Sequence, residues 1–125
     1  MLRCMLRYSP GFVVALVLVA GCAPSGMADL AGELGCKKIK DHPKGLYVPP
    51  GATLVADCYL GGKDVATITW FDNDNNKARD RYVEDVDGLT TDGFVVGDHW
   101  SAECSTQGVC DQVLAEAGGE KWSDK

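Results

Sequence analysis

An apolar run near the N-terminus, from Phe12 to Ala20, constrains this chain more than any other stretch. Arg3 and Arg7 precede the run, and Gly21 and Cys22 end it. A membrane-spanning helix needs roughly 20 apolar residues, whereas the core of a secretory signal is about half as long. The segment therefore predicts a secretory signal and export of the chain. A plain secretory signal or an uncleaved anchor is the alternative.

The end of this run, Val19-Ala20-Gly21-Cys22, resembles the cleavage motif of bacterial lipoprotein precursors. The resemblance implies that the thiol of Cys22 receives a diacylglycerol, that the chain is cut before Cys22, and that the new amine is acylated. Two or more chains give stable membrane anchoring. We therefore expect residues 22–28 to be the lipidated cysteine and a tether, residues 29–125 to be one domain, and the protein to lie on the extracytoplasmic face of the cell membrane.

The net charge of the mature chain limits the classes of partner that it can bind. Loss of Arg3 and Arg7 takes the formal net charge from −6 to −8. Nucleic-acid binding calls for a basic face, so this balance argues against such a partner. Removal of 21 of the 125 residues leaves 104, which is enough for one small domain. We expect the partner to be an envelope protein or an extracellular ligand.

Four cysteines remain after Cys4 leaves with the signal and Cys22 is lipidated. In a small exported domain they predict two disulfides, for which three connectivities are possible. Pairing of nearest neighbours favours Cys36–Cys58 and Cys104–Cys110. No C-x-x-C spacing is present and neither histidine lies at ligand spacing from a cysteine, so we expect no metal site and no cofactor.

The pattern of apolar residues predicts an α+β domain. Asp29 is expected to cap a helix over 30–34 that stops at Gly35, followed by a loop over 37–51. Strands over 53–60 and 64–71 form a hairpin through Gly61-Gly62. The remaining expected elements are a helix over 73–87 capped by Asp72 and ended by Gly88, a strand over 94–104 with a bulge at Gly97-Asp98, and a helix over 109–117 ended by Gly118-Gly119. The prediction is an antiparallel sheet of about three strands covered on one face by helices, as in half of a ferredoxin-like fold.

Several short motifs also resemble a set of small lipoproteins of high-GC Gram-positive bacteria. That resemblance implies the same fold and location, and it brings no established activity. Its members often lack a pair like Cys104 and Cys110. The motifs are Leu34-Gly35-Cys36, Asp57-Cys58, Trp70-Phe71, Ala78-Arg79-Asp80-Arg81, Val95-Val96-Gly97-Asp98-His99-Trp100 and Gly118-Gly119.

Asp98, His99 and Trp100, together with Tyr59, are the candidate binding surface, because histidine titrates near neutral pH and aromatic rings contact ligands. The alternative is a strand bulge with Trp100 packed inward. The run 72–76, with Asp80, resembles the start of a calcium loop, but Lys77 replaces the turn glycine of such a loop. A polar helix cap explains the same residues.

No recognised catalytic motif is present: G-x-S-x-G, H-E-x-x-H and a glycine-rich phosphate loop before a helix are all missing. We therefore expect a membrane-anchored, non-catalytic binding module, with Tyr47, Tyr59, Trp100 and Trp122 as candidate contact aromatics. The alternative is a small envelope hydrolase or metal-dependent enzyme that uses the region of Asp98 and His99.

Overall fold

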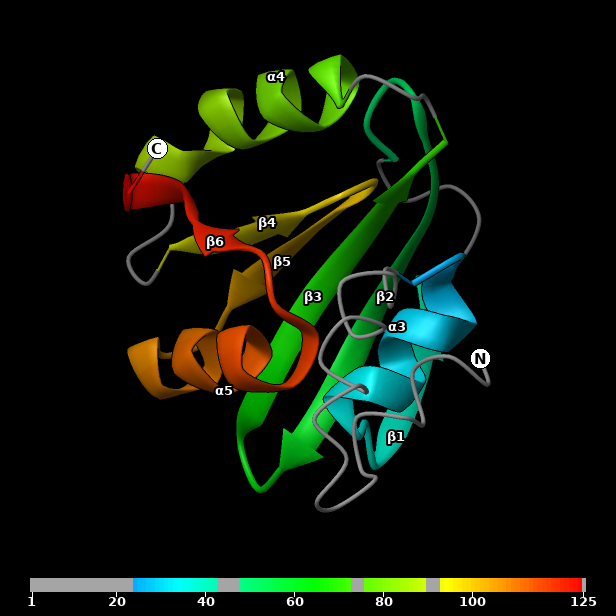
Figure 1. Cartoon of the computed structure of the whole chain (residues 1–125), viewed down its shortest axis with the longest axis vertical. Coiled ribbons are helices and arrows are strands. Elements are labelled where there is room, and N and C mark those ends of the chain that lie inside the picture. Colours follow the sequence, from blue (N-terminus) through cyan, green and yellow to red (C-terminus); the bar gives the residue numbers. More distant parts are fainter. Residues whose placement is uncertain (1–23, 43–47, 73–75, 90–92, 125) are drawn as a thin grey trace, which may run out of the picture.

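A computed structural model describes residues 24–42, 48–72, 76–89 and 93–124. Within these ranges the chain forms one antiparallel sheet of six strands, in the order β1-β2-β3-β5-β4-β6 (Figure 1). Three α-helices of the described residues pack on this sheet. The elements in chain order are α3 (Met27–Leu34), β1 (Lys38–Asp41), β2 (Ala52–Gly61), β3 (Asp64–Phe71), α4 (Lys77–Val86), η2 (Asp87–Leu89), β4 (Phe94–Gly97), β5 (Trp100–Cys104), α5 (Gln107–Ala117), β6 (Glu120–Lys121) and η3 (Trp122–Asp124).

The α+β class and the antiparallel sheet are confirmed, but the expected number of strands is wrong. The segment expected as a loop over 37–51 contains β1, which pairs with β2 from Lys38 opposite Tyr59 to Asp41 opposite Ala56. Its four residues are all exposed, so periodic burial could not reveal it. The strand β6 is only two residues long and also lies at an edge of the sheet.

The expected single strand over 94–104 is a hairpin of β4 and β5. Gly97 pairs with Trp100, and the turn between them holds His99 at φ 74°. A left-handed residue of this kind reverses the chain, where a bulge would only have bent it. The other hairpin, β2–β3, is confirmed, and its turn includes Gly62 at φ 56°.

The helices cover both faces of the sheet, which corrects the expectation of one covered face. On one face, α3 and α5 lie over the alternate residues of the strands and form the larger core. On the other face, α4 packs through Val83 on Phe94 and Val96. Figure 1 shows α4 separated from α3 and α5. The larger core includes Leu30, Leu34, Ala56, Cys58, Ala66, Ile68, Trp70, Val95, Trp100, Ala102, Val109 and Val113.

Both expected cysteine pairs lie at disulfide distance. Cys36, after α3, pairs with Cys58 in β2 at a Cα–Cα distance of 5.3 Å. Cys104, at the end of β5, pairs with Cys110 in α5 at 5.4 Å. All four sulfurs are therefore on the face covered by α3 and α5, and each bond ties a helix or its end to a strand.

The helix ends combine expected and unexpected features. Gly35 ends α3 in the left-handed conformation, and Gly118 follows α5 as expected. Thr106 caps α5 by accepting a hydrogen bond from the Val109 N–H at 3.1 Å. Asp72 does not cap α4, since Asn76 occupies that position at φ 58°.

The first helix begins earlier than expected. Met27 starts α3 and is buried, and Pro24 is buried as well, although both belong to the expected tether 22–28. Asp29 lies in the first turn, where its carboxylate accepts hydrogen bonds from the Ser25 N–H and hydroxyl at 3.0 and 2.8 Å. The packed domain therefore reaches to within two residues of Cys22, which itself lies outside the described residues.

Candidate functional site

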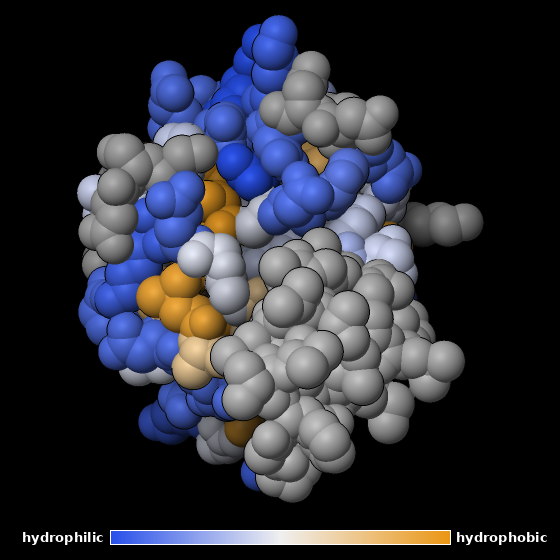
Figure 2. Space-filling view, in the orientation of Figure 1, coloured by the Kyte–Doolittle hydropathy of each residue, from blue (hydrophilic) through white to orange (hydrophobic). Residues whose placement is uncertain are grey.

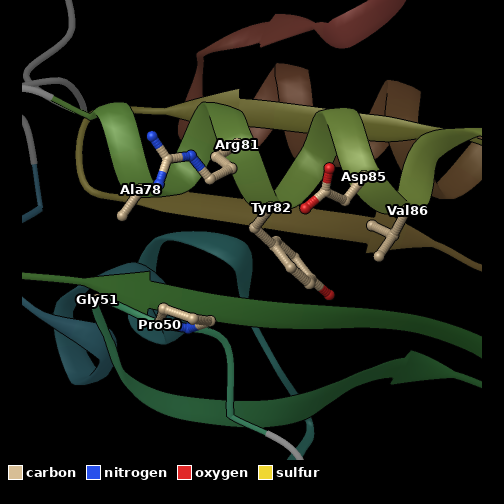
Figure 3. Close-up of a pocket in the computed structure, with 7 residues that line it drawn as sticks. All are labelled: Pro50, Gly51, Ala78, Arg81, Tyr82, Asp85 and Val86. Carbon is tan, nitrogen blue, oxygen red and sulfur yellow. The ribbon is translucent and has the colours of Figure 1, made fainter.

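A groove of about 310 Å³ separates α4 from the segment before β2 (Figure 3). Its volume is at the lower end of the range for small-molecule sites, about 300–1,000 Å³. Apolar side chains from α4 and from Pro50 form its walls, and two charged side chains stand beside them. The lining residues are Pro50, Gly51, Ala78, Arg81, Tyr82, Asp85 and Val86.

The helical repeat explains why α4 both packs on the sheet and lines a groove. Val83 is fully buried against Phe94 and Val96 and fixes the rotation of the helix. Ala78, Tyr82 and Val86 recur at a spacing of four residues, so they form a neighbouring stripe. In Figure 3 these three side chains point from α4 toward the strands and the Pro50–Gly51 segment.

Tyr82 is the fixed aromatic element of the groove. Its ring centroid lies 6.0 Å from that of Phe71 in β3 and 6.1 Å from that of Phe94 in β4. The second pair is edge-to-face, a geometry that aromatic quadrupoles favour. The ring is therefore held by two buried aromatics while the residue itself stays half-exposed at the groove.

Arg81 and Asp85 bring one positive and one negative charge to the groove. Both are exposed and lie one helical turn apart. Among the described residues, neither forms an ion pair or a hydrogen bond with a side chain. Figure 2 shows that the surface over α4, at the top of the view, is mostly hydrophilic, with small apolar patches visible below it.

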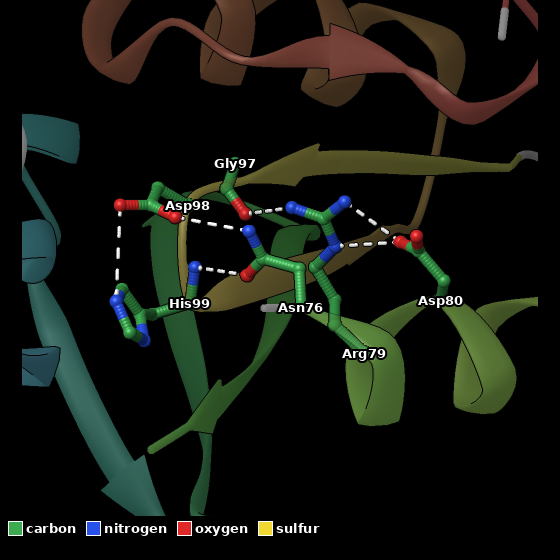
Figure 4. A network of polar contacts seen from close by, with 6 residues as sticks. All are labelled: Asn76, Arg79, Asp80, Gly97, Asp98 and His99. Carbon is green, nitrogen blue, oxygen red and sulfur yellow. Dashed lines mark hydrogen bonds and ion pairs between the residues drawn. The ribbon is translucent and has the colours of Figure 1, made fainter. Parts of the chain in front are cut away.

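A polar network holds the start of α4 against the β4–β5 turn (Figure 4). The side-chain amide of Asn76 donates to Asp98 Oδ1 at 2.9 Å, and its oxygen accepts from the His99 N–H at 2.8 Å. Both ends of this one side chain are thus used to join the helix to the turn.

Arg79 strengthens the same junction. It is 7% exposed and donates from Nη1 to the carbonyl oxygen of Gly97. Its Nε and Nη2 donate to Asp80 Oδ1 at 2.9 and 2.7 Å. Asp80, on the same helix, compensates the charge of this buried guanidinium. The hydrogen bond from Arg79 to Gly97 ties α4 to the end of β4.

The side chain of His99 is mostly buried, with 25% of its surface exposed. Its ring stacks on Trp70 at a centroid distance of 5.8 Å and an interplanar angle of 16°. Its Nδ1 lies 3.0 Å from the carbonyl oxygen of Phe71, and its Nε2 lies 3.8 Å from Asp98 Oδ2. The His99 ring therefore packs on β3, while the His99 N–H and the Asp98 carboxylate hold Asn76 at the start of α4.

Trp100 does not form part of a binding surface, which corrects the prediction for this residue. It is 1% exposed and packs in the core between the sheet and the helices α3 and α5. Gly97 permits this packing, because a Cβ there would lie 2.2 Å from the Trp100 ring. The alternative, in which Trp100 packs inward, describes its position correctly. Trp100 lies at the start of β5, after a turn, and the expected bulge is absent at this point.

Tyr59 lies apart from the other three candidate residues. It pairs with Val65 near the β2–β3 turn, whereas Trp100 pairs with Trp70, five residues further along β3. At about 3.4 Å per residue this separation is roughly 17 Å. Its ring is half-buried beneath Lys38, whose Nζ lies 5.8 Å from the ring centroid. The structure therefore brings Asp98 and His99 together and leaves Tyr59 elsewhere.

A second polar cluster, which the sequence did not indicate, crosses the sheet on the α4 side. Thr67 in β3 pairs with Asp57 in β2 and with Glu103 in β5, so all three side chains share one face. Asp57 Oδ1 accepts from the Thr67 hydroxyl at 2.8 Å and lies 3.2 Å from His42 Nε2. Burial, and to a lesser extent repulsion from Asp57, raises the pKa of Glu103.

Other predicted features can be placed only in part. Cys22, Tyr47 and most of the calcium-like run 72–76 lie outside the described residues. Within the described ranges, no three or more His, Cys, Asp or Glu side chains are grouped to hold a metal ion. No helix in those ranges is long and apolar enough to span a membrane. Trp122 is half-buried against the small core under α4.

Comparison with family models, curated proteins and solved structures finds no match to this chain. The choice of the groove as the candidate site therefore depends on its geometry. The spacing of Ala78, Tyr82 and Val86 was the available sequence signal, but it indicated only an amphipathic helix, because such a stripe normally faces a core. The contribution of Pro50 and Gly51 depends on tertiary packing.

Proposed function

We propose that this protein is a lipoprotein anchored through Cys22 on the extracytoplasmic face of the cell membrane, where it acts as a non-catalytic binding module. The ligand site is the groove between α4 and the Pro50–Gly51 segment. The observation that carries the proposal is the groove itself, which joins an apolar wall of ligand size to two charged side chains that have no partner within the described part of the chain.

The surroundings of the groove support a binding role. Asn76 and Arg79 fix the N-terminal end of α4 on the β4–β5 turn, and Val83 fixes its rotation. The walls are thus preorganised, and a ligand would lose little free energy in ordering them. Asp98 and His99 contribute through this junction.

The early start of α3 supports the location. Pro24 is already buried, so a lipid on Cys22 would hold the domain close to the membrane surface. Intact mass analysis of the membrane fraction tests this point. We expect a mass that shows loss of residues 1–21 and gain of acyl groups, and we expect Cys22→Ser to abolish both. Unchanged cleavage and membrane retention of that variant would contradict the anchor.

Photo-crosslinking in cells tests the binding role. A photoreactive p-benzoylphenylalanine at exposed Pro50 should give an adduct, and Ala78→Trp, which fills the groove, should remove it. The same amino acid at exposed Gln112, on α5 and the opposite side of the sheet, is the matched control. Equal adducts at both positions, or an adduct at position 50 that survives Ala78→Trp, would contradict a ligand site in the groove.

A small envelope hydrolase is the second candidate, favoured by the pair Glu103 and Asp57. Burial raises the pKa of Glu103, and Asp57 accepts a hydrogen bond from Thr67. Two carboxyl groups in unlike environments can serve general acid–base catalysis. Release of reducing ends and free amines from purified cell-wall material is the assay. Equal release by the wild type and Glu103→Gln rejects this candidate.

A further inference from the structure

We infer that the ligand of the groove is a zwitterion of the size of an amino acid or dipeptide, with a free ammonium group, a free carboxylate and an apolar side chain. This inference rests on the proposed function and specifies the chemistry of its ligand. Arg81 would bind the carboxylate, Asp85 the ammonium group, and the wall formed by Tyr82, Val86 and Pro50 the apolar side chain.

The charges of Arg81 and Asp85 are the first observation that supports the inference. Arg81 and Asp85 are four residues apart on α4, where side chains lie about 5–6 Å apart at Cβ and commonly pair with each other. Here no ion pair joins them, and each lines the groove without a partner among the described residues. In Figure 3 both lie on the same side of α4, beside the stripe that points into the groove.

Opposite unit charges at this spacing match a molecule that carries both charges close together. A guanidinium binds a carboxylate through two parallel hydrogen bonds, and a carboxylate binds an ammonium group through charge-assisted ones. A nucleotide or other polyanion would meet one cation and one anion here, in a protein of formal net charge −6 before processing. A zwitterion is the ligand that leaves neither group unpaired.

The size of the groove limits the rest of the ligand. The groove volume of about 310 Å³ is at the lower end of the range of small-molecule sites, so the ligand can be no more than one or two residues long. The Tyr82 ring, held by Phe71 and Phe94, offers a rigid surface to an aliphatic or aromatic side chain. A dipeptide with one large apolar side chain fits this volume and this wall.

Calorimetric titration of the full-length protein in detergent with the dipeptide glycyl-phenylalanine, which has one large apolar side chain, tests the inference. The uncapped dipeptide should bind, and either N-acetylation or C-amidation should weaken binding about tenfold, because each removes one charge-assisted contact. Arg81→Gln should weaken binding of the uncapped dipeptide about tenfold and leave binding of the C-amide unchanged. Asp85→Asn should do the same with respect to the N-acetyl form.

Glu84→Gln and Lys63→Gln are matched controls, since both remove one exposed charge outside the groove. They should leave all affinities unchanged. Equal binding of capped and uncapped dipeptides, equal losses in the controls, or no binding of any form would overturn the inference. The proposed function would survive those results if the adduct at position 50 still formed and still disappeared in Ala78→Trp. Absence of that adduct would contradict the proposed function itself.

Discussion

The two faces of the sheet are built by different means. On one face, α3 and α5 share a large apolar core with the strands, and two disulfides tie these helices to β2 and β5. On the other face, α4 packs through a small cluster around Val83, and a polar network holds its first turn. Both charged side chains of the groove, Arg81 and Asp85, are on α4.

This difference teaches that the fold and the site depend on separate interactions. Apolar burial and cross-links stabilise a small domain, and here both lie on the face covered by α3 and α5. Hydrogen bonds to a turn contribute less free energy but define a geometry. We therefore expect substitutions in α4 to affect the groove more than the stability of the fold.

The largest expected effect comes from removing the Cys36–Cys58 pair. The double variant Cys36→Ala/Cys58→Ala should lose about 3 kcal/mol of unfolding free energy, because the bond closes a loop across 22 positions. The loop closed by Cys104–Cys110 spans only 6 positions, so its removal should cost less, about 2 kcal/mol. Urea denaturation of both double variants measures the difference. A greater loss for the shorter loop would contradict this account of the scaffold.

Substitution of one buried valine on each face compares the contributions of the two faces to stability. Val113 in α5 and Val83 in α4 are both fully buried. Val113→Ala should lower the unfolding free energy by about 2 kcal/mol through lost burial and a cavity. Val83→Ala should cost about 1 kcal/mol, since a small cluster can close around the gap, but it should weaken ligand binding more. Equal losses of stability and binding in the two variants would remove the distinction between the faces.

The junction of α4 can be weakened without touching the groove. Asn76→Ala removes two hydrogen bonds and places alanine at φ 58°, where its Cβ is unfavourable. The expected loss is about 1–2 kcal/mol, together with weaker groove binding. Asn76→Gly is the control, because it loses the same bonds without the backbone strain. An Asn76→Ala protein with unchanged stability would show that the network does not position α4.

The smallest expected effect is the pH dependence from Glu103. A carboxyl whose pKa is raised on folding adds stability that is fully present below its ordinary pKa of about 4.5 and is lost as the pH rises through the raised value. The glutamine of Glu103→Gln stays neutral at every pH. The variant should therefore gain stability relative to the wild type as the pH rises from about 4.5 through the raised pKa of Glu103. Parallel melting curves of the two proteins across this pH range would contradict the assignment.

Sequence patterns predicted the parts of the fold that repeat or that glycine determines. The apolar alternation of β2 and β3, the stop at Gly35 and the hairpin turn at Gly62 follow from local chemistry. The exposed strand β1 has no apolar alternation to detect. Its existence depends on pairing with β2, which is a tertiary effect.

The site was harder to predict for the same reason. Asp98 and His99 were chosen by residue type, yet the left-handed turn at His99 directs them to the junction with α4. Trp100 alternates inward because Gly97 leaves room for its ring. The groove joins Pro50 to a helix about 30 positions later in the chain, and no local spacing reports such a meeting.

Amide hydrogen exchange of the full-length protein in detergent tests the division between the two faces most directly. We predict that the amides of α4 exchange through an opening of lower free energy than those of β3 and α5, because few buried contacts hold α4. Exchange of α4 only through the same global unfolding as β3 and α5 would contradict the account.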